Sequence, residues 1–202
     1  MNLQQHARAM ATGAGLPPLF LKQDVIAFVG ERGAGKDTAC EALWIYDFKT
    51  HAFADGLRAV CREVFGITDK EMADRVLKES PLGRGKWAEQ PVRWFMKIVG
   101  TECFRDNFPG VWIERLWRVA ERVRRVAIPD CRFWDEFESI KARGGIVVRI
   151  DNPNVPVSTD THRSEIEWRE FPADYVLVND FGSAEEFMQH VLEWYAKLPA
   201  RD

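Results

Sequence analysis

Short apolar runs alternate along this chain with longer stretches in which apolar residues recur every three or four positions. Residues 25–29, 125–130, 146–150 and 175–178 are apolar on both faces, a pattern typical of strands inside a parallel sheet. Residues 48–53 predict a weaker additional strand. Strands that alternate with helical stretches predict an α/β fold, with a parallel sheet of about five strands and helices on both faces.

Amphipathic spacing predicts the helices that connect these strands. We expect helices over residues 38–44, 54–65, 92 to about 104, 112–124, from Phe133 to Ile140 and from the capping box at Ser183 to Leu198. The pair Gly144 and Gly145 is typical of a helix C-terminus. Residues 66–90 predict a helix and an exposed basic loop. Residues 54–120 therefore form a predicted helical insertion in the α/β fold.

Size and charge narrow the possible functions. A chain of 202 residues fits one domain with a proper core, here residues 24–202, and its 46% hydrophobic and 29% charged content is ordinary for a globular protein. A net charge of −3 argues against a dedicated nucleic-acid binder. No apolar run is long enough to predict a membrane span.

The chain begins with a stretch of little periodicity, which we interpret as a flexible extension over residues 1–23. Its apolar part is too short and too interrupted for a secretory signal. The cysteines show no paired spacing typical of a zinc site, so they are expected to be reduced thiols. These features predict a cytoplasmic protein.

Residues 30–38, which read GERGAGKDT, stand between the first predicted strand and the first predicted helix. They match the phosphate-binding pattern G-x-x-x-x-G-K-[ST], except that Asp37 separates the lysine from Thr38. The glycines allow a tight turn whose N–H groups point at one anion, and the helix adds its positive N-terminal end. The residues expected to bind the phosphates of ATP are Gly30, Arg32, Gly33, Ala34, Gly35, Lys36, Asp37 and Thr38.

The end of this loop carries the residues predicted to act in chemistry. Lys36 is expected to reach the terminal phosphates as a point charge, and the hydroxyl of Thr38 to bind Mg²⁺. Asp37 is favourable at a helix N-terminus, where it can hold Mg²⁺ through water or orient Thr38. The predicted metal-binding residues are therefore Thr38 and Asp37.

A second group of candidates follows the strand at 125–130. Ligands of open α/β sheets bind at the carboxyl ends of strands, where Asp130 lies, although an Asp in this position is also a common helix cap. Arg132 and Glu136 follow at the same rim. Arginine binds phosphate oxygens two at a time, so the arginines near predicted element ends are candidates, namely Arg93, Arg105, Arg132 and Arg163. A solvated surface position remains the alternative for each arginine.

The chain contains 8 tryptophans, which is a high number. Trp44, Trp117 and Trp194 fall on apolar helix faces and are expected in the core. Trp112 follows a loop and is placed where its ring could stack on a nucleobase. His162 stands near the start of a short predicted helix, where a structural role and a role at the phosphates are both open.

Several collinear segments, which span residues 25–195, carry a resemblance to a known family. They are residues 30–38, Val92–Arg93 with 100–102, Asn107–Phe108 with Trp112, 128–136, Gly144–Gly145, 160–165 and 178–180. Together they resemble the bacteriophage deoxynucleoside monophosphate kinases, a branch of the P-loop nucleotide kinases. The unusual Lys-Asp-Thr ending of the loop is part of this resemblance. It implies the three-layer P-loop NTPase fold, with residues 54–120 as the substrate-binding region.

The resemblance implies an enzyme that transfers the γ-phosphoryl group of ATP to a deoxynucleoside monophosphate (dNMP) with Mg²⁺. It implies that the monophosphate is contacted by Arg93, Gly100, Thr101, Trp112, Asp130, Arg132 and Glu136. Lys97 stands where the family often has a base-reading glutamine, and a lysine can only donate hydrogen bonds, so the base preference is expected to differ. The resemblance also implies a homodimer, in the host cytoplasm if the chain is phage-encoded.

The hypothetical mechanism needs no covalent intermediate, because the substrate phosphate is itself the nucleophile. Lys36 holds the β- and γ-phosphates, Arg93 and Arg132 fix the acceptor phosphate, Asp130 contacts the metal's water shell or the substrate, and Arg163 neutralises the transition state. Two alternatives stay open at this point. One is a P-loop kinase for another small acceptor, such as a ribonucleotide, a coenzyme precursor or a sugar acid. The other is an ATPase switch or a DNA-packaging or repair module.

Overall fold

The structure is a computed structural model that describes residues 23–199, and it divides the chain into two compact units. Of the described residues, the sheet unit comprises 23–52 and 118–199. The helical unit is Phe53–Trp117. Each unit has its own buried apolar cluster, as expected for a compact part of a chain.

The predicted N-terminal extension lies outside the described residues, apart from Gln23. The side-chain amide of Gln23 donates hydrogen bonds to the carbonyl oxygens of Ala120 and Val123, at 2.6 and 2.7 Å. No helix in the described part of the chain has the length and apolar character needed to cross a membrane. All four cysteines are free thiols.

The sheet unit is built on five parallel strands in the order β2-β3-β1-β4-β5. Their bounds are β1 (Asp24–Val29), β2 (Lys49–Thr50), β3 (Arg125–Ile128), β4 (Ile146–Asp151) and β5 (Tyr175–Val178). The central strands β1, β3 and β4 are buried almost throughout, which explains why their sequences are apolar on both faces. The predicted α/β P-loop fold with a five-stranded parallel sheet is confirmed.

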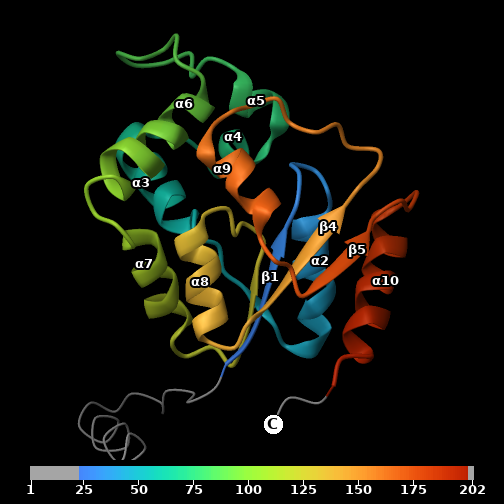
Figure 1. Cartoon of the computed structure of the whole chain (residues 1–202). Helices are drawn as coiled ribbons and strands as arrows, with labels where there is room; N and C mark the ends of the chain where they lie inside the picture. Colours follow the sequence, from blue (N-terminus) through green and yellow to red (C-terminus); the bar gives the residue numbers. More distant parts are fainter. Residues whose placement is uncertain (1–22, 200–202) are drawn as a thin grey trace, which may run out of the picture. The chain divides into compact units, whose positions relative to one another are not determined.

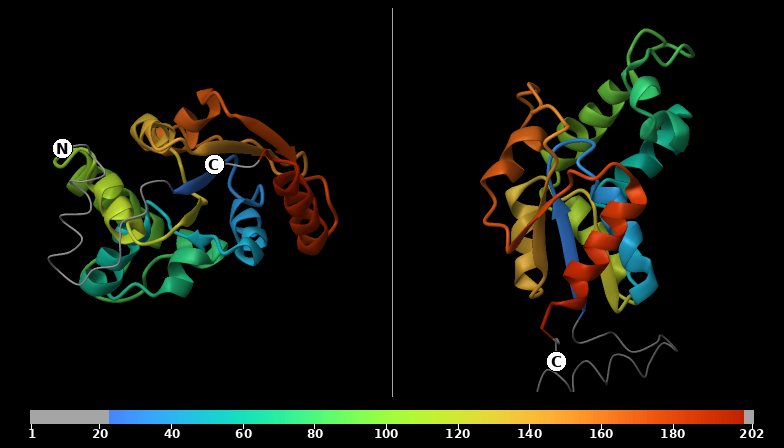
Figure 2. Two further views of the ribbon diagram at one scale, coloured as in Figure 1. Left: turned by 90° about the horizontal axis from the view of Figure 1, so that it is seen from below. Right: turned by 90° about the vertical axis from the view of Figure 1, so that its right-hand side faces the viewer.

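Helices cover both faces of this sheet (Figure 1). On one face, α2 (Lys36–Ala42) packs against α10 (Ala184–Ala196), with Phe28 and Phe187 in a shared apolar cluster. On the other face lies α8 (Trp134–Ala142), which contacts β4. Figure 2 shows the same layers from two further directions. The remaining elements of this unit are η1 (Leu43–Tyr46), α9 (Arg163–Ile166) and η3 (Glu167–Glu170).

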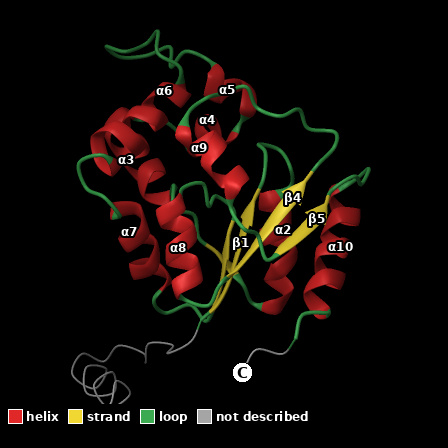
Figure 3. Cartoon of the chain, in the orientation of Figure 1, coloured by secondary structure: helices red, strands yellow, loops and turns green. Residues whose placement is uncertain are grey.

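The helical unit consists of helices and loops without a strand, as Figure 3 shows for residues 53–117. Its elements are α3 (Asp55–Phe65), α4 (Asp69–Ala73), α5 (Arg75–Glu79), α6 (Val92–Lys97) and η2 (Ile98–Arg105). The next helix, α7 (Val111–Ala120), crosses the boundary with the sheet unit. Residues 92–104 were expected to form one α-helix, but the α-helical part ends at Lys97 and η2 continues as a π-helix. π-helical turns are rare and have no reliable sequence signal.

Helix ends follow the local signals in the sequence. Ser183 caps α10 by accepting a hydrogen bond from the N–H of Glu186, and Glu186 accepts one from Gly182, both at 3.2 Å. After α8, Gly144 adopts φ 70°, the left-handed conformation that glycine tolerates best. Local chemistry therefore accounts for both ends.

Two of the three tryptophans expected in the core are wholly or partly buried, and the third prediction is wrong. Trp117 is buried and Trp194 is half-buried, but Trp44 is 55% exposed. The cause is that α2 ends at Ala42 and continues as the tighter 3-10 turn of η1. A 3-10 turn rotates side chains further per residue, so Leu43 points inward and Trp44 outward.

Candidate functional site

The phosphate-binding loop connects β1 to α2 at the carboxyl edge of the sheet. Its last glycine, Gly35, has φ 111°, a conformation that other residues rarely adopt. A Cβ atom at this position would lie 2.6 Å from Nδ2 of Asn179. That amide donates a hydrogen bond of 2.8 Å to the carbonyl oxygen of Ala34, so the end of β5 holds the loop from outside. The loop geometry is therefore fixed both by glycine and by Asn179.

Lys36 is the first residue of α2, and its side chain folds back over the loop. Nζ donates to the carbonyl oxygens of Gly30 and Glu31 at 2.9 and 2.7 Å, and the residue is only 9% exposed. Burial, followed by the nearby positive charge of Arg132, lowers the pKa of Lys36 to about 8. A buried cation satisfied only by neutral carbonyls is suited to bind an anion such as a phosphate.

Asp37 and Thr38 lie in the first turn of α2, where Asp37 is exposed and Thr38 is half-buried. Their carboxylate and hydroxyl oxygens are the ligands that Mg²⁺ prefers, and Mg²⁺ usually takes only one or two protein ligands beside substrate phosphates. The donor set therefore fits a magnesium ion bound together with a nucleotide. Within the described residues there is no cluster of three or more His, Cys, Asp or Glu that could hold a metal alone.

The buried carboxylate of Glu165 lies next to two arginines beside the loop. Glu165 is 4% exposed, and its Oε1 accepts a hydrogen bond of 2.7 Å from Arg132. The guanidinium of Arg32, from the loop itself, lies 3.8 Å from the same oxygen. Arg132 also donates to the carbonyl oxygen of Ser164 at 3.1 Å. Arg132, Arg32 and Lys36 thus place three positive charges at the phosphate-binding loop, with Glu165 between the two arginines.

The two carboxylates predicted near Arg132 take different positions. Asp130 is half-buried, and its charge, with that of Asp37, helps to raise the pKa of the buried Cys40 thiol in α2, after the larger effect of burial. Glu136 is only 2% exposed, and its Oε2 accepts hydrogen bonds from the backbone N–H groups of Arg132 and Phe133, at 2.8 and 3.3 Å.

These contacts make Glu136 a cap for the start of α8, which does not fit its predicted role in binding substrate. A carboxylate in the first turn of a helix can either cap the helix or bind a ligand. The sequence pattern is the same in both cases, so only the structure distinguishes them. Asp130 follows the end of β3 as predicted, and it lies near enough to α2 for its charge to act on Cys40.

Arg163 and His162 lie at the start of α9. Arg163 donates to Glu167 at 2.7 Å, its side chain is 63% exposed, and its guanidinium lies 5.8 Å from the centre of the Phe133 ring. Nδ1 of His162 accepts a hydrogen bond of 3.3 Å from the N–H of Ser164. His162 therefore acts as a structural helix cap, whereas Arg163 is an exposed cation within the sheet unit.

The remaining predicted residues belong to the helical unit. Arg93, on α6, is half-buried and pairs with Glu79. Lys97 ends α6, and Thr101 lies within η2. Gly100 and Trp112 are brought together, because the indole N–H of Trp112 donates to the carbonyl oxygen of Gly100 at 2.9 Å.

Trp112 is 7% exposed, with the ring of Phe104 5.1 Å away and Gly56 against its edge. A ring covered in this way does not fit the predicted stacking on a nucleobase. It supports the carbonyl of Gly100 instead. The sequence could not show this, because a tryptophan after a loop looks the same whether it is covered or open.

Four residues at the loop were not predicted as site residues. Asn179 and Glu165 lie in segments that carry the family resemblance, but no single-sequence signal marks their roles. Glu31 is a variable position of the loop pattern, and Arg169 has no sequence signal at all. Asn179, Glu165 and Arg169 contact loop residues that are far away in the sequence, and Glu31 is the loop residue that binds Arg169.

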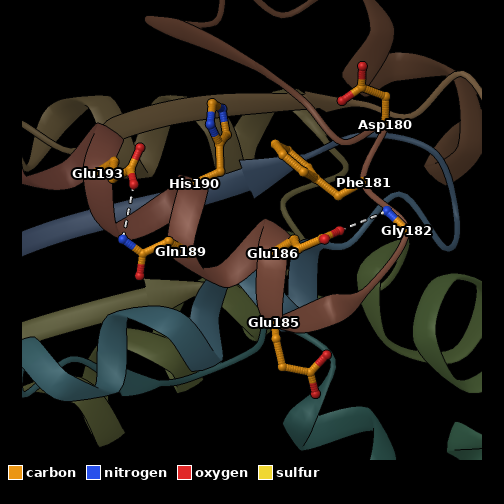
Figure 4. A pocket seen from close by; sticks show the side chains of 8 residues that line it. All are labelled: Asp180, Phe181, Gly182, Glu185, Glu186, Gln189, His190 and Glu193. Carbon is orange, nitrogen blue, oxygen red and sulfur yellow. Dashed lines mark hydrogen bonds between the residues drawn. The ribbon is translucent and has the colours of Figure 1, made fainter.

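A cavity of about 700 Å³ opens beside the start of α10. Figure 4 shows the side chains around it. They are Asp180, Phe181, Gly182, Glu185, Glu186, Gln189, His190 and Glu193. The lining carries carboxylates and neither lysine nor arginine, so this cavity does not suit a phosphate group.

The pKa of Lys36 leads to a prediction for ligand binding. A phosphate ligand favours the charged lysine, so its affinity should fall as the pH rises through about 8, the pKa in the free protein. The expected decrease approaches about tenfold per pH unit above that value. Titration calorimetry with ATP between pH 7.5 and 10 measures it, because the last proton of the triphosphate is almost completely lost in this range. A flat profile in the wild type would contradict the buried-lysine interpretation, and Lys36→Met is the control that should show no such decrease.

Comparison with known proteins gives one relative with substantial identity. The sequence matches no described protein-family profile. A protein of Acanthamoeba polyphaga mimivirus, named by inference as a deoxynucleotide monophosphate kinase, is 34% identical over 187 residues. The match covers 83% of this chain and 94% of the relative, so it includes both units.

Two solved structures match the chain over most of its length. Shikimate kinase from Acinetobacter baumannii, in complex with shikimate, has a TM-score of 0.48 and 18% identity, over 88% of this chain and 96% of its own. Dephospho-CoA kinase from Campylobacter jejuni has a TM-score of 0.49 and 13% identity, over 87% of this chain and 96% of its own.

Proposed function

Because the chain belongs to the P-loop nucleotide kinases, the family of its mimivirus relative, we propose that it transfers the γ-phosphoryl group of ATP to a deoxynucleoside 5′-monophosphate. The observation that carries the choice of acceptor is the 34% identity to that relative across nearly its whole length, together with the activity in the relative's name. In the reaction, an oxygen of the acceptor's 5′-phosphate bonds to the γ-phosphorus. The bond between this phosphorus and the β–γ bridging oxygen breaks, and ADP leaves beside the new diphosphate.

The residues of the sheet unit have a clear division of labour in this proposal. Lys36 exchanges its two loop carbonyls for phosphate oxygens of ATP. Arg132, which was expected from the sequence at the acceptor phosphate, is proposed here to bind oxygens of the transferred group, because its charge lies close to Lys36. Arg163 is an exposed cation that could neutralise the charge of the same group in the transition state. Thr38 and Asp37 would hold Mg²⁺, which supplies neutralisation of the β- and γ-phosphate charge when it is bound. Asp130 orients the acceptor or the water shell of that ion.

The helical unit supplies the acceptor contacts in this proposal. Arg93 binds the 5′-phosphate of the acceptor after exchanging its ion pair with Glu79. The backbone at Gly100 and Thr101 contacts the sugar or phosphate, and Trp112 keeps that backbone in place through its indole N–H. Lys97 faces the base. A homodimer and a cytoplasmic location belong to the same proposal.

A panel of acceptors tests the function directly. Purified protein is incubated with ATP, Mg²⁺ and each of dAMP, dGMP, dCMP, dTMP and their ribose counterparts, and the diphosphates are separated by chromatography. We expect one deoxynucleoside diphosphate and one ADP formed per ATP consumed with at least one dNMP, and no deoxynucleoside diphosphate with Lys36→Met. Absence of product with every dNMP, or slow ATP hydrolysis stimulated only by DNA or protein, would contradict the proposal.

Lys97→Gln tests the proposed reading of the base. Glutamine both donates and accepts hydrogen bonds, whereas lysine only donates, so the substitution should change which base is preferred. One hydrogen bond gained or lost is expected to change the ratio of kcat/KM between two bases about tenfold. Lys70→Gln, on an exposed position of α4, is the matched control and should leave the order of bases unchanged. An unchanged order in Lys97→Gln would remove the role assigned to this residue.

A further inference from the structure

The carboxylate of Glu31, the second residue of the phosphate-binding loop, points to the segment between β4 and β5. Its Oε1 accepts a hydrogen bond of 2.9 Å from Nη2 of Arg169, in η3. Its Oε2 accepts one of 3.3 Å from the backbone N–H of Ser158. The same Nη2 of Arg169 donates to the carbonyl oxygen of Ser158 at 3.0 Å, so the three residues form a closed triangle. We call these three residues the clasp.

The clasp is more enclosed than an ordinary surface ion pair. The side chains of Glu31 and Arg169 are 15% and 32% exposed. The guanidinium of Arg169 lies 5.8 Å from the ring centre of Trp168, which is itself buried. Nε of Arg169 is buried without a hydrogen-bond partner among the described residues. A buried donor left unsatisfied costs free energy, so the other contacts of this guanidinium must hold it in place.

The next loop residue holds the same segment with the opposite charge. Arg32 lies 3.8 Å from Glu165, and Arg132 binds Glu165 at 2.7 Å. Residues 158–169 are therefore attached to the loop twice, once through a loop carboxylate and once through a loop arginine. The two attachments differ in what an incoming phosphate does to them.

Phosphate oxygens compete with Glu165 for Arg32 and Arg132, because all are anions that bind arginine. Arg32 lies 3.8 Å from Glu165, beyond hydrogen-bond distance, whereas Arg169 and the backbone N–H of Ser158 both donate hydrogen bonds to Glu31. The attachment through the loop arginine is therefore the weaker one, and nucleotide binding can release it while the clasp stays closed. One end of the segment is then free to adjust and the other remains fixed on the loop.

We propose that the clasp of Glu31, Ser158 and Arg169 is the fixed anchor of residues 158–169, and that Arg169 is a positioning residue that keeps this segment ordered over the phosphate-binding loop. The expected change in KM for ATP rests on the proposed function, because the segment carries Arg163 and also Glu165, which binds Arg132. Without the anchor, ATP must order the segment at the moment of binding, and the ordering costs part of the binding free energy.

Arg169→Met is the central test, measured as KM for ATP and KM for the acceptor separately. We expect KM for ATP to rise about five- to tenfold, the loss expected for one partly buried ion pair with shared hydrogen bonds. KM for the acceptor should stay within about twofold, because the clasp contacts only the nucleotide loop. Arg169→Lys, which keeps the charge, should recover part of the loss. Arg62→Met, which removes an exposed ion pair with Asp69 in the helical unit, is the matched control and should change neither KM.

Two further measurements separate positioning from general stability. In a double-mutant cycle, KM for ATP of the double variant Glu31→Gln and Arg169→Met should be no higher than KM of the more affected single variant, because both substitutions remove the same interaction. Hydrogen exchange of the ligand-free protein should be faster in residues 157–170 of Arg169→Met, and ATP should restore protection there. Additive effects in the cycle, equal increases in both KM values, or unchanged exchange in this segment would overturn the proposal. The exchange experiment needs no catalysis. It therefore tests the anchoring role of the clasp even if no dNMP is phosphorylated and the proposed function is wrong.

Discussion

Replacing Lys36 with methionine is expected to abolish phosphoryl transfer and, at the same time, to make the ligand-free protein more stable. The loss of rate should be about 10³-fold or more, because catalysis in this family of reactions depends on alignment and neutralisation of phosphate charge. The gain in stability follows from the burial of the lysine, whose pKa falls to about 8 in the folded protein. The two effects have one cause, namely a cation buried for a ligand that is not yet bound.

The sign of the stability change follows from proton linkage. Below pH 8, Lys36 is charged in both the folded and the unfolded chain, and its burial costs the folded state free energy. Between about pH 8 and its ordinary pKa of 10.5 the unfolded chain binds more protons, so the stability of the wild type should rise with pH in this window. Methionine removes the penalty, and at pH 7 we expect a gain of about 1–2 kcal/mol, after loss of the lysine's two hydrogen bonds.

Thermal and denaturant unfolding of both proteins at pH 7 measures this difference. Lys49→Met is a suitable control, since Lys49 is an exposed lysine of the same unit paired with Asp47. It should leave both the rate and the stability close to those of the wild type. A Lys36→Met protein that is inactive but clearly less stable than the wild type would show that the buried charge is not the destabilising feature assigned to it.

Replacing Arg132 with methionine is expected to lower kcat about 10³-fold, in the range found for arginines that neutralise a transferred phosphoryl group. Arg132 is held by Glu165 and the carbonyl oxygen of Ser164, so its fork is oriented before any ligand arrives. The same substitution has a second, independent consequence. Because the charge of Arg132 helps to lower the pKa of Lys36, its removal should raise that pKa.

Kinetics and pH profiles together check both consequences. The decrease in ATP affinity above about pH 8 should move to higher pH in Arg132→Met, whereas Arg132→Lys should keep the original midpoint and lose only rate. Arg125→Met is the matched control, because Arg125 is a similarly exposed arginine at the other end of β3, paired with Asp24. A midpoint that does not move in Arg132→Met would contradict the electrostatic coupling of the two cations.

Much of the fold was predictable because the signals are local. The strands β1, β3, β4 and β5 fall where the apolar runs predict them, and Ser183 and Gly144 mark the expected helix ends. The exceptions also have local physical causes. A π-helical turn replaces the α-helix after Lys97, and a 3-10 turn carries Trp44 outward, and both geometries depend on packing that a periodicity of 3.6 residues does not describe.

The candidate site divides along the same line. The phosphate-binding loop and Lys36 could be predicted because their residues are consecutive and serve one chemical purpose. Glu136 and Trp112 were predicted to contact the substrate, but the structure uses the first as a helix cap and the second to support Gly100. A carboxylate or an indole has the same appearance in the sequence whichever partner it finds.

Consecutive residues are enough to specify the strand, loop and helix of the phosphate site, since glycine, lysine and hydroxyl at fixed spacing need no distant partner to form such a turn. How that loop is held depends on the folded chain, in which Asn179 after β5 binds the loop, Glu165 binds Arg132 and Arg169 binds Glu31. These contacts join residues more than thirty positions apart, and such pairs become neighbours only when the parallel sheet brings its carboxyl edges together.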